Sequence, residues 1–110
     1  MSESTASQRM YRLDRFIVPH QAREEFLARV KATHRVLNEQ PGFIQDFLLE
    51  QPHDENTFVL ATLVEWENAG FIESARAVVK EMHQKIGFNA QETIARLGIK
   101  ADMGSYQRIR

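Results

Sequence analysis

Residues 57–67, TFVLATLVEWE, decide the fold of this 110-residue chain. Side chains alternate between the two faces of a β-strand, so even-numbered and odd-numbered positions form separate rows. One row contains Phe58, Leu60, Thr62, Val64 and Trp66, and the other contains Val59, Ala61 and Leu63. Because both rows are largely apolar, the pattern predicts a strand that is buried on both faces.

The elements on either side of this strand complete an alternating order. Period-two patterns and turn residues predict the other strands, and apolar residues at helical spacing predict the helices. The order β-α-β-β-α-(α)-β predicts an α+β fold of the ferredoxin-like, split βαβ type, with a four-stranded antiparallel sheet and helices on one face. The predicted strands span residues 10–18, 43–51, 57–67 and 103–109, and the predicted helices span residues 20–38, 68–86 and 89–98.

The second face of this sheet needs a cover of its own. The predicted helices lie on one side only, yet the central strand is apolar on both sides. A second copy of the same sheet, packed face to face as a homodimer, would cover Leu48, Val59, Ala61 and Leu63. The sequence therefore predicts a homodimer that is formed through the sheet face.

Composition excludes several classes of protein. The chain has 14 Lys and Arg residues against 15 Asp and Glu, a net charge of −1, and no cysteine. It offers no basic surface for nucleic acid, no disulfide and no sulfur ligand for zinc, and no apolar run approaches the length that crosses a membrane. We expect a cytoplasmic protein with a polar, disordered arm at residues 1–9 and a single domain at 10–110.

The motifs of common enzyme classes are missing. The sequence contains no Gly-rich phosphate loop, no G-x-S-x-G elbow, and no histidine pair at metal-binding spacing. Nucleotide hydrolysis, serine hydrolysis and zinc catalysis therefore lack their usual residues, and no metal site is predicted.

Three short segments in combination resemble the antibiotic biosynthesis monooxygenase superfamily of dimeric α+β barrels. They are RFIVP at 15–19, QPGF at 40–43 and VEWEN at 64–68, and the resemblance extends over roughly residues 9–110. It implies a homodimer in which each site lies between one sheet and its own helices. The best-studied branch of the superfamily oxygenates aromatic polyketides to quinones without flavin, haem or metal, so the resemblance implies no cofactor.

A second branch of this superfamily degrades haem, and its pattern can be compared with this chain. That branch has an Asn on the first strand, a Trp after the third, and a His ten residues beyond the Trp. Here Trp66 matches, but Asp14 and Arg76 occupy the other two positions. No imidazole is placed to bind the iron, so haem is not expected.

Trp66 and two histidines are the first candidates for catalysis. The Trp66 ring either forms one wall of a pocket and donates its N–H to a substrate oxygen, or packs in the core. His34 and His83 each lie four residues after a valine on an apolar helix stripe, where an imidazole acts as a base or bonds to the backbone. Arg76 is the candidate for stabilising negative charge, with Arg15 as an alternative if it faces inward.

Four further residues are candidates for substrate binding. Asp14 is a carboxylate on an apolar strand face, which calls for an ion pair, an exposed edge or a function. Phe43, Phe47 and Tyr106 either surround a small aromatic ligand or fill the core.

Two functions follow from these residues. The first is a cofactor-independent monooxygenase that acts on a small hydroxylated aromatic or quinol-type substrate. The alternative is a non-catalytic small-ligand-binding or stress-associated dimer. If the protein is an enzyme, we expect one histidine within hydrogen-bonding reach of a cavity that Trp66 lines. If it only binds a ligand, we expect both His34 and His83 to form hydrogen bonds that point away from the cavity.

Overall fold

The computed structural model describes residues 8–109 and shows a single four-stranded antiparallel sheet in the order β2-β3-β1-β4. This confirms the predicted α+β, ferredoxin-like fold. Residues 1–7 of the predicted arm, and Arg110, lie outside the described residues. The strands are β1 (Met10–Pro19), β2 (Phe43–Pro52), β3 (Thr57–Trp66) and β4 (Lys100–Gln107), and the helices are η1 (His20–Ala22), α2 (Arg23–Asn38), α3 (Ala69–Lys85) and α4 (Ala90–Arg96).

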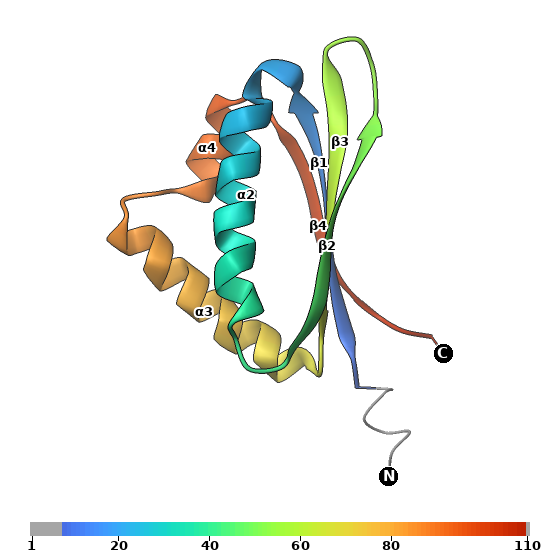
Figure 1. The fold of residues 1–110 in the computed structure, drawn as a ribbon, viewed down its shortest axis with the longest axis vertical. Coiled ribbons are helices and arrows are strands. Elements are labelled where there is room, and N and C mark those ends of the chain that lie inside the picture. Colours follow the sequence, from blue (N-terminus) through green and yellow to red (C-terminus); the bar gives the residue numbers. More distant parts are fainter. Residues whose placement is uncertain (1–7, 110) are drawn as a thin grey trace.

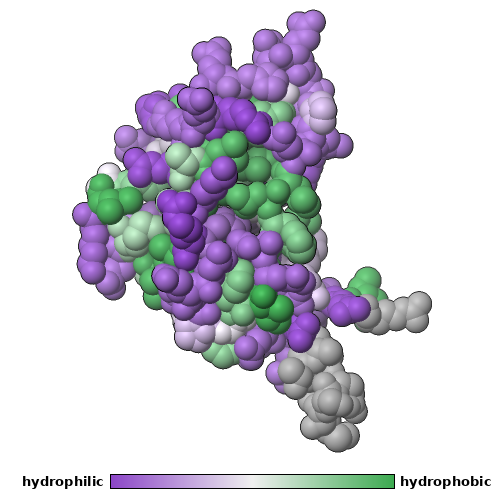
Figure 2. Space-filling model, viewed as in Figure 1, coloured by the Kyte–Doolittle hydropathy of each residue, from purple (hydrophilic) through white to green (hydrophobic). Residues whose placement is uncertain are grey.

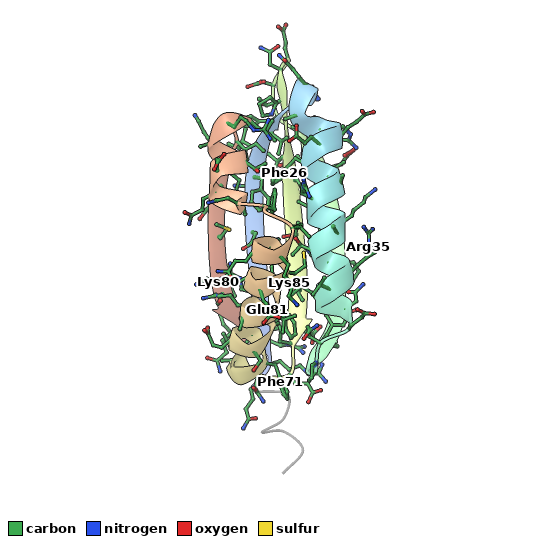
Figure 3. All side chains as sticks on the ribbon, turned by 90° about the vertical axis from the view of Figure 1, so that its left-hand side faces the viewer. Phe26, Arg35, Phe71, Lys80, Glu81 and Lys85 are labelled. Carbon is green, nitrogen blue, oxygen red and sulfur yellow. The ribbon has the colours of Figure 1, made fainter. Side chains whose placement is uncertain are left out.

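The helices of the described chain all cover the same face of the sheet (Figures 1 and 3). Side-chain caps fix where two of them begin. The Asn68 side chain accepts a hydrogen bond from the Gly70 N–H at 3.0 Å, and Asn89 accepts one from the Glu92 N–H at 2.9 Å. None of these helices is long and apolar enough to cross a lipid bilayer, a statement that covers residues 8–109.

Two apolar clusters join the helices to the inner sheet face. The larger cluster includes Phe16, Phe26 and Leu60, and the Phe16 and Phe26 rings meet edge to face at 5.1 Å. The smaller contains Val64, Trp66, Ile72 and Ala75, with Phe43 and Phe71 packed against it. Residues of both clusters also line the cavity of the candidate site.

A β-bulge in β2 corrects the predicted placement of its side chains. The register shifts between Phe43 and Gln45, so Phe43 pairs with Trp66 whereas Phe47 pairs with Leu63. Cross-strand partners share a face, so Phe43 lies on the inner face and Phe47 on the outer face. Leu48 pairs with Thr62 and lies on the inner face, so its predicted position on the outer face is wrong.

The last strand begins three residues earlier and ends two residues earlier than the predicted range 103–109. It spans Lys100–Gln107 at one edge of the sheet. Seven of its eight residues are exposed, and only Gly104 is half-buried. Polar residues at an exposed edge give little apolar pattern, which explains why the sequence did not mark its start.

The outer sheet face carries no helix among the described residues (Figure 1). Its large apolar side chains include Phe47, Leu49 and Tyr106, which are 46%, 53% and 53% exposed. This face therefore presents apolar side chains to solvent in the single chain.

A buried carboxylate closes one end of the outer face. Glu65 is 5% exposed and accepts hydrogen bonds from Arg9 at 3.0 Å, Tyr11 at 3.3 Å and Gln45 at 2.8 Å. Burial raises the pKa of Glu65, but the three donors together outweigh it, and the net shift is downward. The folded chain therefore holds Glu65 ionised.

Candidate functional site

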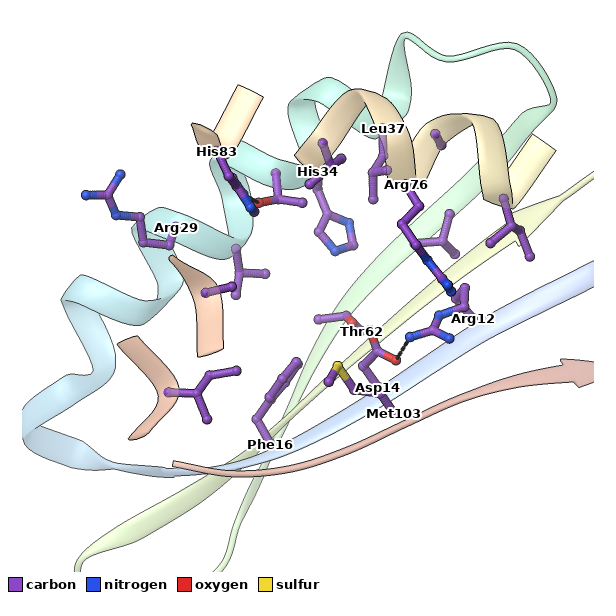
Figure 4. Close-up of a pocket in the computed structure, with 18 of the residues that line it drawn as sticks. Arg12, Asp14, Phe16, Arg29, His34, Leu37, Thr62, Arg76, His83 and Met103 are labelled. Atoms are coloured by element: carbon purple, nitrogen blue, oxygen red, sulfur yellow. Dashed lines mark hydrogen bonds and ion pairs between the residues drawn. The ribbon is translucent and has the colours of Figure 1, made fainter. Parts of the chain in front are cut away.

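A cavity of about 390 Å³ lies between the inner sheet face and the helices (Figure 4). Seen from the side, apolar side chains gather over the middle of the molecule, where the helical layer meets the sheet (Figure 2). The volume of the cavity falls in the range of small-molecule sites. The residues with polar side chains that line it are Arg12, Asp14, Arg29, Thr33, His34, Thr62, Trp66, Arg76, His83 and Gln91.

His34 lies in the cavity wall with a carboxylate behind it. Helix α2 places the residue four positions after Val30, and it is only 8% exposed. Its Nδ1 lies 2.8 Å from Asp46 Oδ2, and Asp46 reaches this position because it pairs with Val64 on the inner face. Figure 4 shows the imidazole pointing from α2 into the cavity.

This contact fixes the tautomer of the imidazole. An ionised carboxylate can only accept, so Nδ1 carries the proton and donates it to Asp46, and Nε2 of the neutral ring is left as an acceptor. Asn38 supports the pair when its amide nitrogen faces Asp46, because it then donates to Asp46 Oδ2 at 3.3 Å and to the His34 carbonyl at 3.2 Å. A neutral imidazole held in this way is suited to act as a general base.

Trp66 forms a buried part of the wall. The residue is 2% exposed, and its ring meets that of Phe43 edge to face at 5.9 Å. The residue also lines the cavity, and its indole N–H is a hydrogen-bond donor only. An indole in such a wall is suited to donate to a ligand oxygen.

Charged side chains gather at the Arg12 end of the cavity. Arg12 donates to Asp14 at 3.1 Å and to Ser105 at 3.2 Å, so it is held on the sheet. Burial raises the pKa of Asp14, and the opposing effects of Arg12, a Gly104 backbone hydrogen bond and His34 do not cancel this rise. Arg76 reaches the same end from α3 (Figure 4).

His83 lines the cavity in a different setting. Its Nε2 lies 3.4 Å from Thr33 Oγ1, and its ring meets Phe88 edge to face at 4.8 Å. Arg29 lies over the Phe88 ring, with its guanidinium carbon 4.5 Å from the ring centroid. Burial, with the charge of Arg29, lowers the pKa of His83, so the ring is neutral at neutral pH without a carboxylate partner.

The structure separates the predicted site residues into two groups. Trp66, His34, His83, Arg76 and Asp14 line one cavity. The remaining predicted residues lie outside it: Phe43 packs behind Trp66, and Phe47, Tyr106 and Arg15 lie on the outer face.

Sequence reasoning missed two residues that define the site. Asp46 orients His34, and Thr62 is 4% exposed in the cavity wall between Asp14 and Leu48 on the neighbouring strands. The sequence does contain an indication for Asp46, because its carboxylate lies between the apolar pairs 43–44 and 47–48. Like Asp14, a carboxylate in an apolar strand segment needs a hydrogen-bond or ion-pair partner. Within residues 8–109, no group of three or more His, Asp or Glu side chains is placed to hold a metal ion.

Comparisons with known proteins agree with this architecture. The antibiotic biosynthesis monooxygenase family matches residues 11–85. A provisionally assigned monooxygenase from Shewanella loihica PV-4 superposes with a TM-score of 0.69 at 20% identity, over 94% of this chain and 97% of that chain. SnoaB, a cofactor-independent oxygenase from Streptomyces nogalater, gives 0.64 at 22% identity, over 94% and 95%.

A third structure concerns assembly. A dimeric ferredoxin-like protein from an uncultured marine organism superposes with a TM-score of 0.67 at 10% identity, over 93% of this chain and 96% of that chain. Comparison with proteins of curated function finds no match. At these identities the likeness shows a shared fold.

Proposed function

Because this chain belongs to the antibiotic biosynthesis monooxygenase family, we propose that it is a cofactor-independent oxygenase of small hydroxylated aromatic compounds. The observation that carries the proposal is the His34–Asp46 pair, which holds the His34 imidazole in the wall of a largely apolar cavity that Trp66 also lines. SnoaB, which shares the fold, is described as a cofactor-independent oxygenase, and this supports the reaction type.

In the proposed reaction His34 Nε2 accepts a proton from a phenol or from the acidic carbon of an anthrone. The resulting anion is electron-rich, and it transfers electrons directly to dioxygen. One oxygen atom forms a bond to the ring carbon and the other leaves as water, so an anthrone and dioxygen give a quinone and water. The protein supplies the base, the orientation and a largely apolar cavity.

Three other groups assist in this scheme. The Trp66 N–H donates to the oxygen on which negative charge develops, and Arg76 stabilises negative charge on the substrate from the end of the cavity. Asp46 holds the imidazole in the required tautomer and stabilises the imidazolium that forms.

The geometry also bears on the non-catalytic alternative. That hypothesis predicts that both histidines bond outward, away from a pocket that they only shape. His34 instead lies in the wall of the cavity that Trp66 lines, with its carboxylate partner behind it. This arrangement favours catalysis over binding alone.

The test is oxygen uptake with dithranol, an anthrone, by the purified protein. We expect turnover that stops under anaerobic conditions and a loss of roughly 100-fold or more in kcat for His34→Ala, the usual contribution of a general base. His53→Ala, in the exposed turn between β2 and β3, is the matched control and should behave as the unmodified protein. Quinone formation without oxygen, or full activity in His34→Ala, would refute the proposal.

The same proposal includes a homodimer formed through the outer sheet faces. Its support is the row of exposed apolar side chains, Phe47, Leu49 and Tyr106, together with the fold shared with a protein described as dimeric. Packing one copy against another would remove these side chains from water.

A further inference from the structure

The cavity contains more positive than negative charge. Three arginines line it, Arg12, Arg29 and Arg76, against a single carboxylate, Asp14, whose charge is already engaged by Arg12. The chain as a whole carries a net charge of −1, so this excess is local to the site. Positive charge confined within low-dielectric walls attracts an anion.

The two arginines at one end of the cavity differ in how they are held. Arg12 is fixed on the sheet by Asp14 and Ser105. Among residues 8–109, Arg76 forms a long ion pair with Glu73 on the same helix, at 3.7 Å, and its side chain is 58% exposed. Figure 4 shows the Arg76 side chain extending from α3 toward Arg12, whose guanidinium is turned to Asp14 at the same end of the cavity.

The positive charges of Arg12 and Arg76 repel one another unless an anion lies close to both. A guanidinium presents paired N–H donors that match the two oxygens of a carboxylate, so two such groups form a receptor for a planar anion. His34 lines the same cavity as Arg12, Asp14 and Arg76. One small molecule can therefore reach both the arginines and the base.

From this arrangement we propose that the substrate is an aromatic carboxylic acid, whose carboxylate binds between Arg12 and Arg76 while its reacting hydroxyl or acidic carbon faces His34. The inference rests on the proposed function for the identity of the reacting end. The anion site itself is a separate property, because it needs no oxygen chemistry. Arg76 is the residue that determines specificity, since Arg12 has partners of its own on the sheet.

The test uses two compounds that differ only in charge: rhein, a dihydroxyanthraquinone carboxylic acid, and its neutral carboxamide. Both are already quinones, so binding can be measured by calorimetry without turnover. We expect the unmodified protein to bind rhein roughly tenfold or more tightly than the amide, as for a charged hydrogen-bonded pair. Raising the salt concentration should reduce this preference.

The variants identify the residue responsible. Arg76→Gln should reduce the preference for the acid to within a factor of about three, and Arg76→Lys should retain part of it, because lysine keeps the charge but not the paired donors. Arg35→Gln is the matched control, since Arg35 lies on α2 and is not among the residues that line the cavity (Figure 3).

Equal affinity for acid and amide, a preference unchanged in Arg76→Gln, or no binding of either compound would overturn the inference. These outcomes are distinct from failure of the proposed function. Oxidation of neutral dithranol without any preference for rhein overturns the anion site alone. Preferential binding of rhein by a protein that consumes no oxygen supports the anion site and refutes the oxygenase.

Discussion

Replacing Gly42 by alanine tests how the Trp66 end of the site is built. Gly42 has φ +83°, and an added Cβ would overlap the Phe71 ring and lie 2.5 Å from Phe71 Cβ. Holding an alanine in this left-handed conformation costs about 1 to 2 kcal/mol. Forcing apart a packed aromatic side chain adds about 1 to 3 kcal/mol, so we expect a total loss of about 2 to 5 kcal/mol in the free energy of unfolding.

Gly87→Ala separates the two contributions. Gly87 has φ +69°, and an added Cβ there meets no heavy atom within 4 Å. This variant should lose only the backbone part, about 1 to 2 kcal/mol. The difference between the two variants measures the contact of residue 42 with Phe71, which packs against the cluster that contains Trp66.

The assay is urea denaturation at one fixed protein concentration, because the proposed assembly would make stability depend on concentration. With a slope of about 2 kcal/mol per molar urea, Gly42→Ala should lower the midpoint by roughly 1 to 2.5 M and Gly87→Ala by roughly 0.5 to 1 M. Fluorescence of the only tryptophan, Trp66, follows the transition. Equal losses in the two variants would refute the close packing of Gly42 against Phe71.

Three further predictions concern catalysis, pH and assembly. Asp46→Asn should lower kcat with dithranol by roughly 100-fold, with little change in KM, because an amide no longer fixes the His34 tautomer. Steady-state oxygen uptake measures both constants, and an unchanged kcat would contradict the role of Asp46. Glu65 has a folded pKa below its usual value of 4.5, so its stabilising effect is present above that pH and lost as the pH falls below it. Glu65→Gln should therefore flatten the acid side of a stability profile measured by denaturation, and an equally steep profile would argue against the ionised state. Leu63→Asp on the outer face should dissociate the proposed dimer while the subunit stays folded, whereas Leu60→Asp should unfold the subunit. Light scattering that shows a monomer of the unmodified protein at micromolar concentration would contradict the proposed dimer.

The sequence predicted the fold because its long elements have strong periods. The alternation at 57–67 identified the central strand, and the capping asparagines marked the starts of α3 and α4. The inner row of that strand led directly to the cavity, since Thr62, Val64 and Trp66 line it. Periodicity was sufficient wherever an element is buried along its full length.

Features that depend on pairing between distant strands could not be predicted. A bulge after Phe43 depends on the register of β2 against β3, and it determines that Asp46 and Leu48 face inward while Phe47 faces outward. The His34–Asp46 pair exists only because of this register. Sequence spacing within one strand contains no information about the position of its neighbour.

The alternation along β3 has a consequence for how this protein can change. Of its even-numbered side chains, Thr62, Val64 and Trp66 line the cavity, and its odd-numbered side chains form the surface proposed for assembly. Substitutions can therefore alter the cavity lining or the outer surface separately, as long as the number of residues in the strand is unchanged. Deleting a single residue within the strand would shift every later side chain to the opposite face and so exchange the two surfaces. Natural variation in this strand should accordingly consist of replacements, while insertions and deletions accumulate in the exposed turn at residues 53–56.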